Sequence, residues 1–371
     1  MIQRTISNQL LAKFKSGKVI FLIGPRQVGK TTLINSILKG EEFLFLNGDD
    51  PTTRKLLTNP NTEQIKGIIG RHTLVFVDEA QRIENIGITL KLITDQLDNV
   101  QLIVSGSSAF ELSNQTNEPL TGRKWEFKLY PISWQEFQDH VGYLKAEQQL
   151  EQRLIYGMYP DVINHLGSEV EVLKNLSDSY LFKDILAFSG IRKPQVLEKL
   201  LMALALQVGS EVSYNELAQT VGVDKNTISS YITILEQTYV IFRLSSFSRN
   251  LRSEIRTNQK IYFVDNGVRN AIIGNFDPLE VRNDRGMLWE NFLISERRKK
   301  LTYSGSLAKH YFWRTKQQQE VDYVEAEATR LNAYEFKWNP NARAKIPKLF
   351  EATYETNVVT IHNENFRDFI F

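Results

Sequence analysis

The sequence predicts an α/β protein with a parallel sheet covered by helices, a winged-helix region and then a second α/β region. Apolar runs at 19–23, 74–77 and 102–104 alternate with helical stretches, as in a parallel sheet buried on both faces. A helix-turn-helix pattern occupies 211–264, and strand-like alternation returns at 320–324. Three domains are therefore predicted, with boundaries at 1–145, 146–264 and 265–371.

Length and composition limit the class of protein. The 371 residues suit two or three domains, on a prior of roughly 100–200 residues each. The lack of cysteine excludes disulfides and thiolate zinc sites. The sequence has no apolar run of membrane-spanning length and no signal-peptide pattern, so we expect a cytoplasmic protein with no membrane partner. The net charge of +2 means that any nucleic-acid binding must come from local patches.

The segment 24–31, GPRQVGKT, fits the phosphate-loop pattern GxxxxGK[ST] at every fixed position. It lies between an apolar strand-like run and a helical stretch. Backbone N–H groups of such a turn, together with the helix N-terminus, attract phosphate. Lys30 would reach the β- and γ-phosphates of ATP, and the Thr31 hydroxyl would ligate Mg²⁺. The expected nucleotide contacts are Gly24, Pro25, Arg26, Gln27, Val28, Gly29, Lys30, Thr31 and Thr32.

A carboxylate pair, Asp78-Glu79, ends the next buried run. Asp78 would hold the Mg²⁺ shell through water, and Glu79 would polarise the attacking water as the catalytic residue. The alternative is a strand that ends in two solvated acids. An additional strand is expected at 43–46, between the phosphate loop and this pair.

Three further polar residues are candidates for the same site. Ser105 and Ser107 follow the run 102–104, where either could sense the γ-phosphate; a simple turn is the alternative. Arg123 begins a strand-like segment, and we expect it near the nucleotide, stabilising γ-phosphate charge in its own site or a neighbour's. A surface arginine is the alternative for Arg123. Action in a neighbour's site would require an oligomer, and the sequence leaves the oligomeric state open.

Several segments, in this order along the chain, match a known family. They are GPRQVGKTTL (24–33), LVFVDEAQRI (74–83), SGSS (105–108), TGRKWEFKLYPISWQEF (121–137), KIYFVDNGVRN (260–270), GMLWENFLISE (286–296) and the pair EVDY…YEFKW (320–338). On these segments the chain resembles the prokaryotic AAA-type ATPases that carry a C-terminal domain of unknown function with a restriction-endonuclease-like fold. The resemblance implies ATP binding and leaves the biological role open. One departure is Gly157-Met158, where the family usually shows a glycine pair before Tyr-Pro.

The middle of the chain is predicted to be helical and then to form a winged helix. Residues 213–216 fit a capping box, 221–223 form the turn, and Asp224 caps a second helix. An apolar stripe precedes them, consisting of Leu173, Leu176, Tyr180, Leu181, Ile185 and Leu186. The residues expected to face outward, as in a DNA-reading helix, are Lys225, Asn226, Ser229 and Ser230. The wing carries five basic residues against Glu254: Arg243, Arg249, Arg252, Arg256 and Lys260. They suit phosphate contact, and a protein-packing module is the alternative.

Acidic residues near the C-terminus suggest a second catalytic centre. Strand periodicity places Glu335 and Lys337 on one face, and a suitable pairing would bring Asp322 beside them. Glu290, on a predicted helix, would add another acid. Asp322 and Glu335-x-Lys337 resemble the PD-(D/E)xK nuclease site, with Val321 where the proline would stand. The alternatives are an inherited fold without cleavage activity and a solvated hairpin face.

Three functions follow from these patterns. The leading one is a Mg²⁺-dependent ATP hydrolase whose nucleotide state controls the winged helix and the nuclease-like region on DNA. The second is a nucleotide-dependent interaction switch or assembly factor that binds a protein partner. The third is an active Mg²⁺-dependent nuclease.

Overall fold

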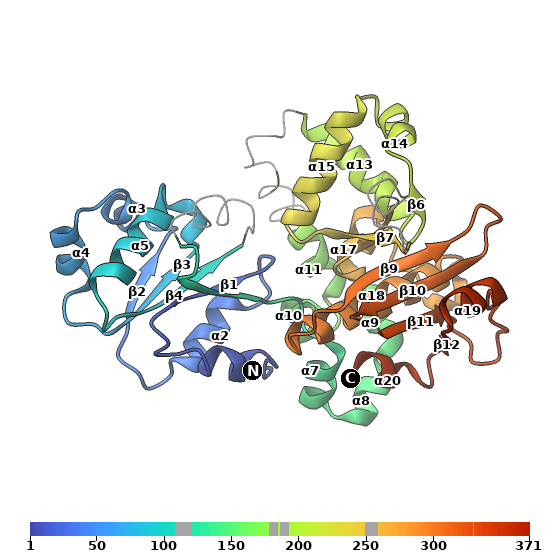
Figure 1. Ribbon diagram of the computed structural model, residues 1–371, viewed down its shortest axis with the longest axis horizontal. Helices are drawn as coiled ribbons and strands as arrows, with labels where there is room; N and C mark the ends of the chain where they lie inside the picture. Colours follow the sequence, from blue (N-terminus) through green and yellow to red (C-terminus); the bar gives the residue numbers. More distant parts are fainter. Residues whose placement is uncertain (108–119, 178–184, 186–192, 249–258, 329) are drawn as a thin grey trace. The chain divides into compact units, whose positions relative to one another are not determined.

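The computed structural model describes residues 1–107, 120–177, 185, 193–248, 259–328 and 330–371 (Figure 1). The chain divides into two compact units. The first consists of residues 1–131 with 237–239, and the second consists of residues 132–236 with 240–371. The predicted three-domain division stays a prediction.

The first unit is built on a parallel sheet, which confirms the predicted α/β class. Its strands, in the described residues, run in the order β2-β3-β4-β1-β5, and every neighbouring pair is parallel. The predicted segment 43–46 forms the edge strand β2, and β4 lies between β1 and β3. The strand bounds are β1 (Val19–Ile23), β2 (Leu44–Asn47), β3 (Leu74–Asp78), β4 (Gln101–Gly106) and β5 (Lys124–Lys128).

Helices bury the faces of this sheet. Alternate residues of the central strands, such as Phe21 and Val75, pack in one core with Leu57, Ile65 and Leu90 from α3, α4 and α5. The intervening strand residues are also buried, which explains why the strands are continuously apolar. The helix bounds are α1 (Ser7–Leu11), α2 (Lys30–Ile37), α3 (Pro51–Leu57), α4 (Thr62–Ile69), α5 (Ile86–Gln96) and the 3₁₀ turn η1 (Ala80–Arg82).

The second unit contains a mixed sheet that includes the strands predicted to form the wing. Its described strands run in the order β12-β11-β10-β9-β7-β8-β6. β7 pairs with β8 antiparallel and with β9 parallel, so the predicted wing strands and the C-terminal strands form one continuous sheet. The bounds are β6 (Glu211–Val212), β7 (Ile241–Ser246), β8 (Gln259–Phe263), β9 (Lys309–Arg314), β10 (Glu320–Glu327), β11 (Arg330–Phe336) and β12 (Val358–Ile361).

The segment predicted to be a helix-turn-helix contains two helices, α14 (Tyr214–Val221) and α15 (Lys225–Gln237). Ser213 Oγ accepts a hydrogen bond from the Glu216 N–H and begins α14. Gly222, with a φ of 80°, ends it. The Asp224 carboxylate caps α15 through the Thr227 N–H and hydroxyl. Figure 1 shows both helices beside α13 (Pro194–Leu206).

Short helices and one long helix complete the second unit. The long helix α18 (Arg285–Tyr303) carries Trp289 and Phe292, which contact Phe366 in an aromatic core. In the predicted stripe, Leu173, Leu176 and Ile185 are buried, while Tyr180, Leu181 and Leu186 lie outside the described residues. The other helices are α7 (Trp134–Val141), α8 (Tyr143–Gln148), α9 (Leu150–Tyr156), α10 (Pro160–Asn164), α11 (Glu169–Asn175), α17 (Asn266–Ile273), α19 (Lys348–Tyr354), α20 (Phe366–Ile370) and the 3₁₀ turn η3 (Leu279–Val281). Across the described residues, every helix is too short or too polar to cross a membrane.

Buried polar side chains join segments of the second unit that are distant in the sequence. Asp265 accepts hydrogen bonds from the N–H groups of Met158, at 2.7 Å, and Val268, at 3.1 Å. Gly157 lies so close that a Cβ there would be 2.0 Å from Asp265 Oδ1. Asn266 donates to carbonyls of both α9 and α18. The segments around residues 157 and 265 therefore meet in a packing contact.

Candidate functional site

The phosphate loop connects β1 to α2 and is shaped by close backbone contacts. A Cβ on Gly24 would lie 2.0 Å from the Leu129 carbonyl oxygen, so only glycine fits there. Gly29 and Gln27 have φ values of 90° and 58°, which turn the chain into the helix. Lys30 Nζ donates to the carbonyls of Gly24, at 3.0 Å, and Pro25, at 2.7 Å. These bonds hold the Lys30 ammonium over the loop. There a phosphate oxygen can replace one of the carbonyls as the hydrogen-bond acceptor. The predicted contacts lie together at this loop and the first turn of α2: Gly24, Pro25, Arg26, Gln27, Val28, Gly29, Lys30, Thr31 and Thr32.

Arg4 stabilises the phosphate loop through hydrogen bonds to backbone carbonyls. Its guanidinium donates to the Val28 carbonyl at 2.8 Å and to the Tyr130 carbonyl at 2.6 Å. Arg4 is 6% exposed, so these contacts are buried. The sequence reasoning missed this residue, because an isolated arginine 20 positions before the motif carries no local signal.

Asp78 ends β3 beside the start of α2 and receives three donors. Thr31 Oγ1 donates to Asp78 Oδ2 at 2.7 Å. Oδ1 accepts from the Ser105 hydroxyl and, at 3.1 Å, from the Glu79 N–H. A hydroxyl and a carboxylate so placed fit Mg²⁺, which P-loop proteins hold through such a pair, phosphate oxygens and water. Ser105 therefore orients Asp78.

Glu79 is held by two side chains beyond the predicted pair. Gln81 Nε2 donates to Glu79 Oε2 at 2.7 Å and to Ser107 Oγ at 2.8 Å. Arg26 Nη2 lies 3.8 Å from Glu79 Oε2. Gln81 and Ser107 are both buried, so Gln81 links the tip of β4 to the catalytic candidate. Sequence reasoning missed Gln81, although its position in the DEAQ segment, two residues after Glu79, was a usable signal.

Arg123 lies at the end of the sheet where the strands start, whereas its predicted role in its own nucleotide site requires the opposite end. Its carbonyl accepts from the Val19 N–H at the start of β1, whereas Gly24 follows the end of β1. At about 3.3 Å per residue, the strand separates the two positions by roughly 16 Å. The side chain is 42% exposed and pairs with Asp95 at 2.7 Å. The expectation that Arg123 lies near its own nucleotide is therefore wrong. A role in a neighbour's site stays a prediction.

The predicted acids of the second unit gather around the start of β10 and the end of β11. Asp322 Oδ2 accepts from the Phe336 N–H at 2.8 Å, and Glu335 Oε1 accepts from Lys337 Nζ at 2.7 Å. Loss of water contact and the charges of Glu290 and Glu335 raise the pKa of Asp322 well above its ordinary value. Loss of water contact also raises the pKa of Glu335, against the ion pair with Lys337. These residues form the acid centre, consisting of Glu290, Glu320, Asp322, Glu335 and Lys337.

Lys260 lies inside the acid centre. It is 2% exposed, and its Nζ pairs with Glu290 at 3.2 Å and with Glu320. The prediction that it contacts phosphate from the wing is therefore wrong. Arg243, also predicted to do so, donates from Nε to Glu236 at 2.9 Å. Arg249, Arg252 and Arg256, as well as Glu254, lie outside the described residues.

The exposed side of α15 matches the predicted pattern. Lys225, Asn226 and Ser230 are exposed, and Ser229 is half-buried. The buried side consists of Ile228, Tyr231, Ile232 and Leu235. The helix thus presents short polar side chains and one lysine at its N-terminal half.

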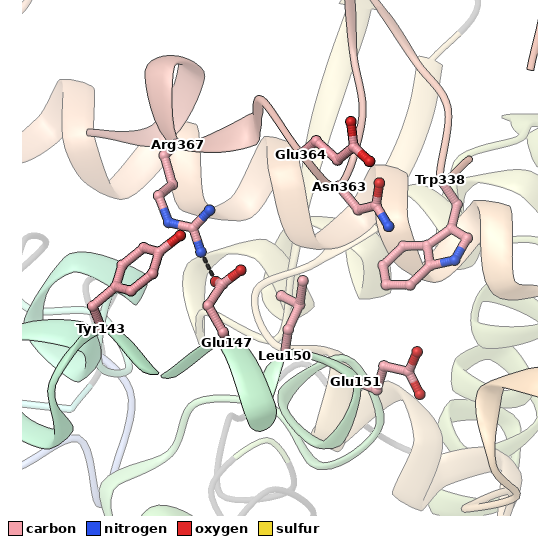
Figure 2. A pocket seen from close by; sticks show the side chains of 8 residues that line it. All are labelled: Tyr143, Glu147, Leu150, Glu151, Trp338, Asn363, Glu364 and Arg367. Atoms are coloured by element: carbon pink, nitrogen blue, oxygen red, sulfur yellow. Dashed lines mark ion pairs between the residues drawn. The ribbon is translucent and has the colours of Figure 1, made fainter. Parts of the chain in front are cut away.

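A cavity of about 440 Å³ opens elsewhere in the second unit. Figure 2 shows Arg367 reaching the Glu147 carboxylate, with Tyr143 beside it and Trp338 on the opposite wall. The Trp338 ring packs against Trp289 of α18, with ring centroids 5.2 Å apart. The cavity lining shares no residue with the acid centre. Its lining residues are Tyr143, Glu147, Leu150, Glu151, Trp338, Asn363, Glu364 and Arg367.

Comparison with family models divides the chain into three matched segments. Residues 16–138 match the family described as AAA domain. Residues 147–279 and 285–368 match two domains of unknown function, DUF8612 and DUF4143. The restriction-endonuclease-like fold inferred for the C-terminal segment is not part of either description.

Two similar proteins are described only as uncharacterized. An uncharacterized protein of Haemophilus influenzae is 26% identical over 74% of this chain and 74% of its own length. An uncharacterized protein of Mycobacterium tuberculosis is 27% identical over 87% of this chain and 71% of its own. Among solved structures, the Walker-type ATPase of Pyrococcus abyssi covers 74% of this chain and 96% of its own, at 15% identity and a TM-score of 0.49. Residues 16–138, which contain the phosphate loop and the Asp78-Glu79 pair, are thus similar to the AAA domain family.

Proposed function

We propose that the first unit binds ATP with Mg²⁺ and hydrolyses it. The observation that carries this proposal is a set of hydrogen bonds beside the loop: Thr31 Oγ1 and the Glu79 N–H donate to the Asp78 carboxylate, and Gln81 donates to the Glu79 carboxylate. A protein that only holds nucleotide needs the loop and its lysine. A carboxylate held by two further side chains beside that loop is suited to activating water.

Each residue has a definite task in this proposal. Lys30 releases a loop carbonyl and draws negative charge from the β- and γ-phosphates. Thr31 and Asp78 would hold Mg²⁺, directly and through water, and the ion would supply charge neutralisation for the phosphate oxygens. Glu79 accepts a hydrogen bond from a water molecule in line with the γ-phosphate and polarises that water for attack. Ser107, at the tip of β4, acts on Glu79 through Gln81.

A phosphate-release assay on the full chain tests this function. We expect Glu79→Gln to bind ATP as wild type does and to lose about 10²- to 10⁴-fold in kcat, the usual contribution of a general base. Lys30→Ala should lose nucleotide affinity. A wild-type rate no higher than the rate of either variant would refute hydrolysis.

We further propose that the nucleotide state of the first unit controls the second unit on DNA. The exposed Lys225, Asn226 and Ser230 on a capped helix support this proposal, as expected of a helix that reads DNA. The charge argument is weaker than the sequence suggested, because Arg243 and Lys260 are committed to acids of the same unit. A protein partner bound through the helix-turn-helix therefore stays the alternative.

Salt-dependent DNA affinity separates these two proposals. DNA binding should fall steeply with salt, and Lys225→Ala should reduce the slope of log K against log salt by about 0.9 if that lysine neutralises one phosphate. Lys199→Ala, at an exposed lysine on α13, is the matched control. The combined Arg249→Ala and Arg252→Ala variant tests the wing in the same way. Absence of binding at low salt would favour the protein partner.

The sequence also predicts a Mg²⁺-dependent nuclease at Asp322, Glu335 and Lys337, which interact electrostatically with Glu290 in the acid centre. Incubation of DNA with Mg²⁺, for wild type and Asp322→Ala, tests it directly. Cleavage that the substitution abolishes would support a nuclease. Cleavage that survives it would assign the activity elsewhere.

A further inference from the structure

An internal ammonium group occupies the acid centre. Lys260 enters it from β8 of the helix-turn-helix part, whereas Glu290 comes from α18 and Glu320 from β10. Its Nζ pairs with both of these acids and also interacts electrostatically with Asp322. The Lys260 side chain is 3% exposed, so the charge has been withdrawn from water. A buried ammonium of this kind is stable only when its counter-charges are held close to it.

The acids around Lys260 also contact other groups of this chain. Glu290 Oε1 accepts from Tyr262 OH at 2.6 Å as well as from the ammonium. Glu320 also faces Arg314 Nε at 3.4 Å. These carboxylates are therefore held toward Lys260.

The remaining acids, Asp322 and Glu335, are each partly occupied by protein donors. Asp322 Oδ2 and Glu335 Oε1 each accept a hydrogen bond from a protein donor. Glu335 Oε2 is a buried oxygen with no hydrogen-bond partner in the described residues, and it is the strongest point in favour of a metal. Mg²⁺ requires near-octahedral oxygen ligands and loses its water reluctantly. Nowhere in the described parts of the chain do three acidic or histidine side chains come together in a metal-holding arrangement.

We propose that Lys260 is the resident cation of the acid centre, in the place that a divalent metal would take, and that the centre is closed to metal-dependent cleavage in this arrangement. Its carboxylates instead join β8 to β10 and α18 through one ammonium. Burial alone would lower the pKa of Lys260, but the acids outweigh it and raise that pKa. The lysine therefore stays charged throughout the pH range in which the protein is handled. This inference is independent of ATP hydrolysis, which belongs to the first unit.

Counting bound Mn²⁺ by electron paramagnetic resonance tests the inference on the full chain without nucleotide. All proteins carry Asp78→Asn, which disables the metal position of the phosphate loop. We expect this background protein to bind no Mn²⁺ at the acid centre. Lys260→Met should gain one site, at least ten-fold tighter than any residual binding in the background, and should lose it on further change of Asp322→Asn. Lys260→Arg, which keeps the charge, should stay free of metal.

Two results would overturn the proposal. One is Mn²⁺ binding in the background protein that Asp322→Asn removes, because the centre would then be open with Lys260 in place. The other is a folded Lys260→Met protein, judged by circular dichroism, that gains no site. If Lys260→Met does not fold, the background protein and Lys260→Arg still decide, because metal bound to either at Asp322 contradicts a resident ammonium.

Discussion

Replacing Gln81 with alanine should slow ATP hydrolysis without weakening ATP binding. Gln81 Nε2 is the donor that joins Glu79 to Ser107, at 2.7 and 2.8 Å. A hydrogen bond to a charged group contributes about 1.5–3 kcal/mol. If that energy is realised when Glu79 meets water in the transition state, kcat should fall roughly 10- to 100-fold. The dissociation constant for ATP should stay within about two-fold, because the Gln81 side chain bonds Glu79 and Ser107 rather than the phosphate loop.

A matched glutamine controls for the general loss of hydrogen bonds. Gln101, at the start of the same strand β4, donates to the carbonyls of Lys18 and Leu102 at 2.9 and 3.0 Å. Gln101→Ala therefore loses similar bonds at the edge of the sheet away from the nucleotide, and kcat should be unchanged. Steady-state phosphate release gives kcat, and a fluorescent ATP analogue gives affinity.

Coupling to Ser107 gives a second measure of the same contact. If Ser107 acts through Gln81, the double variant Gln81→Ala with Ser107→Ala should lose no more than Gln81→Ala alone. The reasoning is refuted if Gln81→Ala keeps kcat within two-fold of wild type or if Gln101→Ala lowers kcat equally. It is also refuted if the effects of the Gln81 and Ser107 changes simply add.

The other predictions concern stability of the second unit. Gly157→Ala should destabilise it by about 3 kcal/mol or more in urea unfolding, because its Cβ would lie 2.0 Å from Asp265 Oδ1, whereas Gly274→Ala has open space and should cost about 1 kcal/mol for its positive φ alone. Asp284→Asn should cost about 2 kcal/mol at pH 7: although burial opposes it, hydrogen bonds from Arg282 and Arg269 lower the pKa of Asp284 to about 2 from 3.8. Since the folded pKa lies below the unfolded value, this stabilisation is present above pH 3.8 and disappears as the pH falls toward 2; an equal loss at pH 7 and pH 2 would contradict the assignment.

The arrangement of the candidate ATP site was largely predictable because its residues are contiguous in sequence. The loop at 24–31 and the pair Asp78-Glu79 each follow or end a buried strand. One short segment therefore predicts both a strand and a functional group. Ser107 was located correctly at a strand tip but contacts Gln81. Arg123 was misplaced because a strand's start was taken for the nucleotide edge. In a parallel sheet all strands start at one end of the sheet and finish at the opposite end, where ligands bind.

The second unit was harder to predict because its contacts join distant segments. Asp322, Glu335 and Lys337 do gather as the hairpin register requires, and β10 pairs with β11 as proposed. The wing was judged by counting charges, which cannot tell an exposed lysine from a buried one. Lys260 belongs to the same charged run as Arg256, yet its strand places it 2% exposed against Glu290, 30 residues away.

Polar residues within one motif of the second unit thus have two different structural roles, and composition alone does not distinguish these roles. Asp265 and Asn266 of KIYFVDNGVRN satisfy backbone groups of neighbouring helices, so this polar motif serves packing. Lys260, the first residue of that same motif, reaches the acid centre instead. One short segment therefore anchors α17 and also neutralises the carboxylates of β10 and α18. A buried charge that loses its partner costs about 3–5 kcal/mol. A change that breaks the acid centre should therefore also destabilise the sheet around β8.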